Sequence, residues 1–175
     1  GNAAAASTFS GAVTLNKAAV LTQVAGGTVT FSGVISGAGF GVTKTDTGAV
    51  AFAGAGANTY SGATTVNAGT LTLGKSAGTN ALAGPLVVGD DDGTANNDVV
   101  RLTNSNQIPD ASAVTVASSG LLDLNGASDT INALSLASGA TIGAGVATCV
   151  VTLTLGGVVT HTVFGAGATG AVISG

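Results

Sequence analysis

The chain has 175 residues, of which 29 are glycine and only 3% are aromatic, and it contains neither methionine nor tryptophan. A compact sandwich or barrel of this length spends more large side chains on its core, so the composition argues against both. Charged residues make up 7% of the chain. The four basic residues are scattered along it, and the formal net charge is −4. This balance argues against electrostatic binding to nucleic acid or to anionic lipid.

Short runs that alternate Val, Thr, Leu or Phe with small residues recur along the chain, separated by Gly, Asn, Asp and Ser. Such alternation predicts strands, and no amphipathic helix fits the stretch Gly37–Leu73. All eight acidic residues are aspartate, which we interpret as acids placed in turns. In chain order the predicted strands are Ala12–Leu15, Thr28–Ser32, Gly48–Phe52, Ala63–Val66, Thr70–Leu73, Pro85–Val88, Val99–Thr103, Ala113–Val116, Leu121–Leu124, Ala133–Leu136, Cys149–Leu155 and Val158–Phe164.

The spacing of these strands fits either a meander of β-hairpins or a parallel β-helix. The shortage of large side chains favours the β-helix, because coils stacked about 4.8 Å apart bury a thin core of Val, Leu, Ala and Thr. No shift in composition marks a domain boundary, so we predict a single β-helical segment over 1–175. No window offers the ~18 uninterrupted apolar residues that span a bilayer, so we predict no direct membrane span.

The two ends of the chain are weakly similar to each other. Residues 9–37 align without gaps on 147–175, so that Val13-Thr14-Leu15 falls on Val151-Thr152-Leu153 and Ile35-Ser36-Gly37 on Ile173-Ser174-Gly175. No terminal cap that would protect an open strand edge is apparent. We therefore expect a solenoid that is uncapped at both ends and belongs to a longer array or a polymer.

Two motifs resemble a known family. Residues 41–45 read GVTKT and residues 58–71 read NTYSGATTVNAGTL, which together resemble the autotransporter-associated β-strand repeat, or passenger-associated repeat, of bacterial surface proteins. The runs NSNQIPD at 104–110 and LDLNG at 122–126 are similar to what often follows that repeat. Asp46 stands where the family usually has glycine, and Ala55-Gly56 looks like an insertion before the Asn-Thr-Tyr turn.

The resemblance covers most of residues 30–136 and implies an all-β, right-handed parallel β-helix. It further implies secretion by a Gram-negative-type cell and a role as passenger stalk, adhesin or surface fibre. Because the repeat is a scaffold, the resemblance implies no catalytic residues.

An acidic segment offers the only candidate metal ligands. Asp90-Asp91-Asp92-Gly93, followed by Asp98, provides oxygen ligands of the kind that calcium prefers. The spacing completes no EF-hand loop, since no Glu follows, and it does not match the glycine-rich nonapeptide of calcium β-rolls. A solvated turn is the favoured interpretation, with Asp90, Asp92 and Asp98 as the candidate calcium ligands; we predict no cofactor.

Cys149 and His161 are the remaining residues with distinctive chemistry. Cys149 shares its alternation with Val151 and Leu153, so we expect it to point inward as a small hydrophobic residue; otherwise an intermolecular disulfide is open to it. His161 faces the core if Val159 and Val163 do, and solvent if Val158 and Phe164 do. A structural role is favoured in both cases, because neither residue has the partners that a zinc site or a nucleophile requires.

Two minor alternatives concern an enzyme and an ice-binding surface. A polysaccharide-active β-helix needs clustered acids, or calcium with a basic residue, whereas the acids outside 90–98 are isolated and Arg101 is the only arginine. Ice binding would need ranked threonines, but the Thr-x-Thr pairs are irregularly spaced and threonine is in any case a good β-former. These pairs are Thr28/Thr30, Thr43/Thr45, Thr70/Thr72, Thr152/Thr154 and Thr160/Thr162.

The sequence therefore predicts a structural component, not an enzyme, of an extracellular or bacterial cell-surface fibre. Its units would stack end to end through their strand edges. The expected partners are copies of the chain or adjacent repeats, with surface glycans or other cells as further candidates. The alternative is a stalk segment of an autotransporter-type adhesin passenger whose binding tip lies elsewhere.

Overall fold

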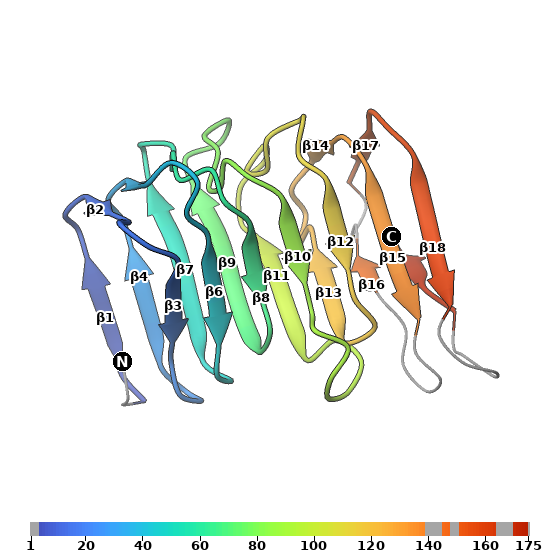
Figure 1. The fold of residues 1–175 in the computed structure, drawn as a ribbon, viewed down its shortest axis with the longest axis horizontal. Helices are drawn as coiled ribbons and strands as arrows, with labels where there is room; N and C mark the ends of the chain where they lie inside the picture. The colour runs from blue at the N-terminus through green and yellow to red at the C-terminus, as the bar shows by residue number, and fades with distance from the viewer. Residues whose placement is uncertain (1–3, 139–144, 148–150, 164–169, 175) are drawn as a thin grey trace.

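The computed structural model describes residues 4–138, 145–147, 151–163 and 170–174. Throughout these residues the regular elements are strands, which wind into a parallel β-helix of about seven turns (Figure 1). In Figure 1 the chain rises through the farther sheet and descends through the nearer one while it advances from left to right. This sense of winding is right-handed, so the predicted fold class is confirmed.

Two long sheets carry the fold, and all neighbouring strands in both are parallel. The eight-stranded sheet consists of β1 (Ala6–Phe9), β4 (Thr28–Phe31), β7 (Ala49–Gly54), β9 (Gly69–Lys75), β11 (Asp98–Leu102), β13 (Gly120–Asp123), β16 (Gly145–Ala147) and β19 (Val172–Ser174). The seven-stranded sheet consists of β3 (Ala19–Thr22), β6 (Val42–Thr45), β8 (Thr64–Val66), β10 (Leu86–Val88), β12 (Val114–Val116), β15 (Leu134–Ser138) and β18 (Val159–Val163).

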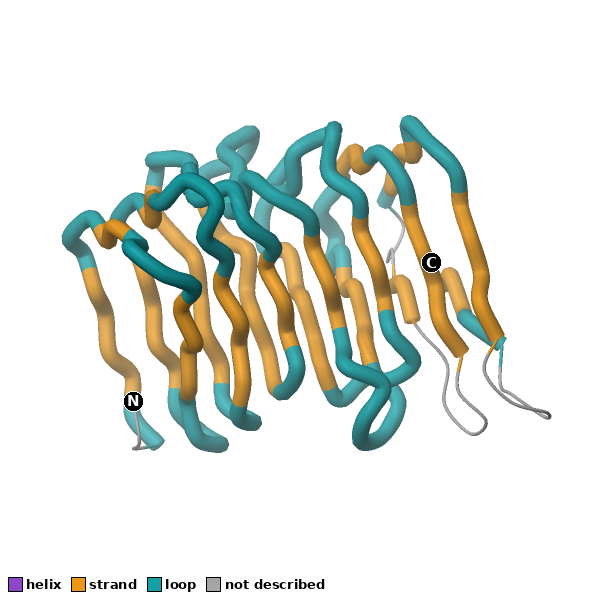
Figure 2. The backbone as a smooth tube through the Cα atoms, in the orientation of Figure 1, coloured by secondary structure: helices purple, strands orange, loops and turns teal. Residues whose placement is uncertain are grey.

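A third, narrower face closes the coil along the upper edge of Figure 2. Two short strand pairs lie there: β2 (Val13–Thr14) with β5 (Ile35–Ser36), and β14 (Asp129–Ile131) with β17 (Leu153–Leu155). Between them the chain has no regular strand, but backbone bonds still join successive coils, such as Ala81 N to Gln107 O at 2.7 Å. The stack is therefore continuous on all three faces.

Columns of inward side chains form the core, because residues in register on parallel strands point to the same face. Val29, Val50, Leu71, Val100 and Leu122 make one such column in the eight-stranded sheet, and all of them are buried. Val66, Val88 and Val116 are their counterparts in the seven-stranded sheet. Burying these columns along the whole axis is the main favourable term in the stability of such a stack.

Sequence alternation located most of the observed strands but missed seven of them. The missed strands are β1, β3, β5, β6, β14, β16 and β19, which are short or contain polar and alanine residues. The predicted strand Cys149–Leu155 is a strand only over Leu153–Leu155, and residues 148–150 lie outside the described part. Aspartates are not confined to turns either, because Asp98, Asp123 and Asp129 lie in strands.

The predicted similarity of 9–37 to 147–175 does not follow the strand register. Along the eight-stranded sheet Thr28 is in register, strand by strand, with Val172, whereas the alignment places Val34 there. Val34 instead precedes β5 on the narrow face. The coils differ in length: Leu134 follows its partner Val114 by 20 residues and Asp98 follows Gly69 by 29. A constant offset therefore cannot track equivalent positions.

Candidate functional site

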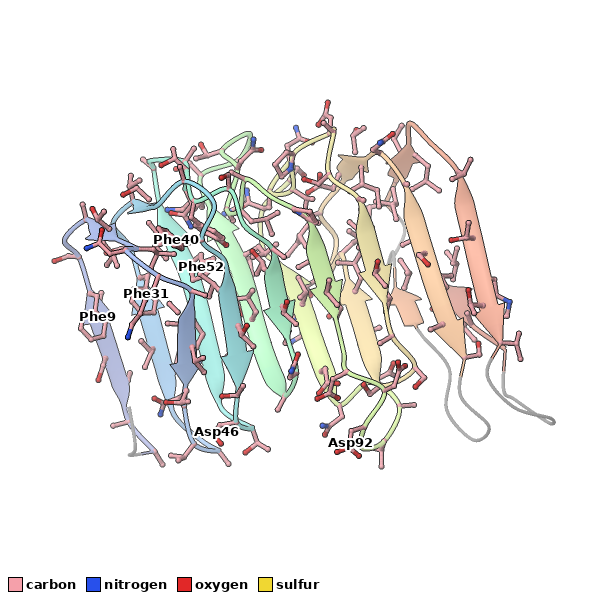
Figure 3. The ribbon with its side chains drawn as sticks, viewed as in Figure 1. Phe9, Phe31, Phe40, Asp46, Phe52 and Asp92 are labelled. Carbon is pink, nitrogen blue, oxygen red and sulfur yellow. The ribbon has the colours of Figure 1, made fainter. Side chains whose placement is uncertain are left out.

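The acidic segment 90–98 lies in the long loop between β10 and β11, visible beside the labelled Asp92 in Figure 3. Asp90 and Asp92 are exposed and cap their own turn, with Asp92 N donating to Asp90 Oδ1 at 3.1 Å. Asp91 Oδ1 instead accepts from Ser118 N at 2.8 Å. Within the described residues no three acidic, histidine or cysteine side chains are grouped to hold a metal ion. The geometry therefore gives the calcium hypothesis no support.

Asp98 is separated from its exposed neighbours because it lies inside the coil. Its residue is fully buried, and its carboxylate accepts from Asn97 Nδ2 at 3.2 Å. In the ladder it pairs with Gly69 and Gly120, so it occupies a position that is glycine in both adjacent coils. Burial raises the pKa of the Asp98 carboxyl, and hydrogen bonds from Ser119 and Asn97 oppose that effect. Asp98 is thus part of the interior.

Two lysines are buried, which the sequence analysis did not anticipate. Lys44 Nζ donates to three turn carbonyls, those of Thr45 at 2.8 Å, Asp46 at 2.5 Å and Ala68 at 2.9 Å. Burial lowers the pKa of Lys44 to about 8, although Asp46 and Asp98 attract the charge and act in the opposite direction. The signal was present in the sequence, because Lys44 shares its strand parity with the buried Val42.

Lys75, the last residue of β9, also uses its ammonium group to join coils. Its Nζ donates to Ala53 O at 2.9 Å and to Gly33 O at 3.3 Å, which belong to the two preceding coils. Burial lowers the pKa of Lys75. Both ammonium groups are used to tie together coils, and neither is presented to a substrate.

Other buried polar side chains also join coils. Asn58 Oδ1 accepts from Ile35 N at 2.8 Å, and its Nδ2 donates to Ala81 O at 2.7 Å, so one amide connects three coils. Asp129 Oδ2 accepts from the backbone N–H groups of Gln107 at 2.8 Å and Ile108 at 3.2 Å. Burial raises the pKa of Asp129 and these bonds oppose the rise. Such bonds satisfy backbone groups where the narrow face has no regular ladder.

An ion pair lies on the outer face of the eight-stranded sheet. Arg101 and Asp123 are register partners on adjacent strands, and Arg101 Nε contacts Asp123 Oδ2 at 2.6 Å. The two charged groups are therefore paired with each other.

Threonines line up in columns on both long sheets, although their spacing in the sequence is irregular. In the eight-stranded sheet Thr28 and Thr70 face outward in one column, separated by Ala49, and Thr30 and Thr72 lie in the next column. On the seven-stranded sheet an outward column reads Thr43, Thr65, Val87, Thr115, Ser135 and Thr160. The argument from irregular spacing was therefore wrong, because loops of different length hide a constant register. The ice-binding alternative itself stays a prediction.

One end of the stack exposes apolar side chains that the middle of the stack buries. Phe9 is 54% exposed, whereas its register partner Phe31 is half-buried and the next, Phe52, is fully buried. The rings of Phe9 and Phe31 stack with centroids 5.2 Å apart, and Figure 3 shows Phe9, Phe31 and Phe52 following one another along the axis. Beside Phe9 a cleft of about 200 Å³ opens between β1, β4 and β3, lined also by Leu21 and Val29.

The other end repeats this pattern with aliphatic residues. Val159 and Val163 are 50% and 55% exposed, yet they are in register with the buried Leu134 and Ser138 and so face inward. Ile173 continues the column of the buried Val146 and is 54% exposed. Among the described residues no further coil lies over these side chains.

His161 lies in this same terminal layer. It is in register with the buried Leu136 and flanked by the inward Val159 and Val163, which decides between the two predicted orientations. Its Nε2 lies 2.7 Å from Ser138 Oγ. The parity predicted for Cys149 holds for Val151 and Leu153, which pack on the core, but Cys149 itself lies outside the described residues.

Charge is concentrated in the middle of the sequence. All eight aspartates fall between Asp46 and Asp129, and no Asp, Glu, Lys or Arg follows Asp129. Before Lys44 the only charged side chain is that of Lys17. Depletion of charge together with exposed apolar side chains is typical of the centre of a protein interface, so the two ends are the strongest candidate functional surfaces.

The comparison with protein families identifies part of the stack. The passenger-associated-transport-repeat family model matches residues 42–73. Residues 42–73 are therefore similar to a passenger-associated-transport-repeat. Searches of curated proteins and of solved structures gave no significant match to the chain.

The matched residues run from β6 into β9. The family resemblance inferred from the sequence is thereby confirmed for these residues. Asp46, which replaces the usual glycine, has φ 63°, so it adopts the left-handed conformation that glycine would supply. The turn thus keeps its geometry despite the substitution. No helix among the described residues is long and apolar enough to cross a membrane.

Proposed function

We propose that this chain is a structural, non-enzymatic β-helical unit of a bacterial surface fibre, in which copies stack end to end. The observation that carries the proposal is the pair of apolar ends, which hold no charged side chain except that of Lys17. Phe9 at one end and Ile173 at the other are exposed, although their columns become fully buried toward the middle of the stack, and Val163 is exposed next to the buried Ser138. The passenger-associated-transport-repeat at 42–73 supports an extracellular setting, because that family occurs in passengers of secreted proteins.

The geometry favours a second copy of the chain as the partner that covers each end of the stack. β1 and β19 are the two edges of one sheet, and β3 and β18 are the two edges of the other. The strands of each sheet are parallel, so a copy advanced along the axis offers the same strand direction and the same sheet separation. Free backbone groups on these edges can then pair by β-augmentation while the apolar layers meet. The net charge of −4, carried by the middle, disfavours lateral packing and leaves the ends free to associate.

Head-to-tail contacts between unlike ends do not close, so they predict filaments. The test is sedimentation velocity and negative-stain electron microscopy of the purified chain over a concentration series. We expect rods whose length grows with concentration, and we expect Phe9→Asp and Ile173→Asp each to shorten them. Thr115→Asp, which adds the same charge to an exposed lateral position, is the matched control and should leave the length unchanged.

Mixing the two end variants provides the sharper test. Phe9→Asp blocks the N-terminal end of the stack and leaves its C-terminal end intact, whereas Ile173→Asp does the reverse. One intact end of each variant can therefore pair with the other, so the mixture should form dimers and nothing longer. Wild-type rods that stay monomeric at all concentrations would contradict the fibre.

The second candidate function is a stalk segment of an autotransporter-type adhesin passenger, with its binding tip elsewhere. The match of residues 42–73 to the passenger-associated repeat favours it. In a stalk the coils over Phe9 and Ile173 come from the same polypeptide. Monomeric rods in the experiment above would support this role, and surface glycans or other cells would then be partners of the tip.

A further inference from the structure

We propose that His161 makes end-to-end association sensitive to pH, so that copies stack at neutral pH and separate in acid. This inference rests on the proposed function, because it concerns the regulation of the same terminal surface. His161 belongs to the inward column of Val116 and Leu136, and it is exposed only because it lies in the last strand of its sheet. Another coil placed over β18 would bury it.

Burial of the imidazole is compatible with its neutral form only. Histidine is the side chain whose charge ordinarily changes between about pH 5 and 8, and an apolar environment disfavours its charged form. In its neutral form the ring has a partner in the buried Ser138, whose Oγ lies 2.7 Å from Nε2. The flanking Val159 and Val163 provide no group that could compensate a positive charge.

Among the described residues around His161, no acid is placed to stabilise the imidazolium. β18 is paired with β15, which reads Leu-Ser-Leu-Ala-Ser, and the nearby strands β16, β17 and β19 also lack titratable residues. In the first coil of the incoming copy the only charged side chain is Lys17, which would repel the charge. Protonation of His161 must therefore oppose association.

The expected size of the effect follows from proton linkage. If the stacked state contains only neutral His161, each added unit of acidity in the range where histidine ordinarily becomes protonated raises the apparent dissociation constant by up to tenfold. The dissociation constant should therefore be about tenfold larger at pH 5.5 than at pH 7.5, with a larger ratio at pH 5.

The experiment measures the dissociation constant of the chain by sedimentation velocity at pH 5, 5.5, 6.5 and 7.5, for wild type and two variants. His161→Gln keeps a neutral polar side chain and should associate with little dependence on pH. His161→Lys carries a permanent charge and should associate weakly at every pH. Circular dichroism of each monomer checks that the variant keeps the β-sheet content of the wild type.

The outcomes separate the two proposals. Association of the wild type that is independent of pH, or a pH dependence that His161→Gln retains, overturns the role of His161 and leaves the fibre intact. Absence of wild-type association at every pH overturns the fibre and this inference together.

Discussion

At the residue scale, the interior of this protein contains charged side chains that alternate with apolar ones. Lys44 and Lys75 are fully buried, and their ammonium groups bind backbone carbonyls of adjacent turns and coils. A buried charge is destabilising unless it is paired and hydrogen-bonded. The two lysines therefore couple the stability of the stack to pH.

Lys44 predicts a rise in stability in alkaline solution. Its pKa of about 8 in the folded chain is below the ordinary value of 10.5, so the unfolded chain binds more protons between these pH values. The free energy of unfolding should therefore increase from pH 8 to pH 10.5, on the order of 1–2 kcal/mol after screening by solvent. Urea unfolding at pH 7.5, 9 and 10.5 measures the slope.

The variant Lys44→Met isolates this contribution. It should lose stability at pH 7.5, because the carbonyls of Thr45, Asp46 and Ala68 lose their donor, and it should show a smaller rise with pH than wild type. The exposed Lys17→Met is the control and should retain the wild-type slope. An equal slope in Lys44→Met and wild type would show that other groups carry the pH dependence.

A second prediction at this scale concerns the close approach of coils at Gly48. A Cβ atom added there would lie 2.1 Å from Val24 O and 2.6 Å from Gln23 O. Because backbone cannot move away as a flexible side chain does, Gly48→Ala should reduce the free energy of unfolding by about 2–4 kcal/mol. Gly11→Ala, which meets nothing within 4 Å, is the matched control and should change it by less than about 0.5 kcal/mol. Thermal unfolding that is similar for both variants would contradict the coil spacing.

At the element scale, the narrow face needs side chains to replace the missing strands. Asn58 performs this function between β5 and the segment that contains Ala81. Asn58→Ala would leave Ile35 N and Ala81 O buried without a partner, so we expect a loss of about 2–4 kcal/mol in chemical unfolding. The exposed Asn16→Ala, at a turn on the first coil, should lose less than about 0.5 kcal/mol. A loss for Asn58→Ala as small as that for Asn16→Ala would mean that water replaces both bonds.

Alternation in the sequence predicted strands well where inward positions carry Val or Leu, as in β10 and β12. It failed for β6, where the inward positions are Val42 and Lys44, because a lysine reads as a surface residue unless its ammonium can reach buried carbonyls. It also failed to find the terminal surfaces. Val163 and His161 share their parity with core residues, and sequence alone cannot tell which coil lies at an end.

At the scale of the whole molecule, each coil contacts mainly its neighbours, so stability is expected to fall toward the ends. The middle strands β9 and β11 have partners on both sides and fully buried inward residues. Backbone amides there should therefore exchange with solvent slowest, whereas those of β1 and β18 should exchange fastest. Hydrogen exchange followed by mass spectrometry checks this gradient, and uniform protection along the axis would contradict it.

The same measurement on assembled material extends this prediction. If copies stack end to end, β1 and β18 acquire partners, and their amides should become protected as the concentration rises while β9 stays unchanged. Protection that increases only in lateral loops would instead point to side-by-side packing.

The sequence by itself determined the class of fold and the resemblance of residues 41–45 and 58–71 to the passenger-associated repeat. These depend on local patterns: period-two alternation, glycine at turns and the types of residue present. Only the tertiary structure decided the register, which varying coil lengths hide, and with it the threonine columns, the buried lysines and the inward direction of His161. Position along the stack decided the rest, because the same inward residue is core in a middle coil and surface in a terminal one.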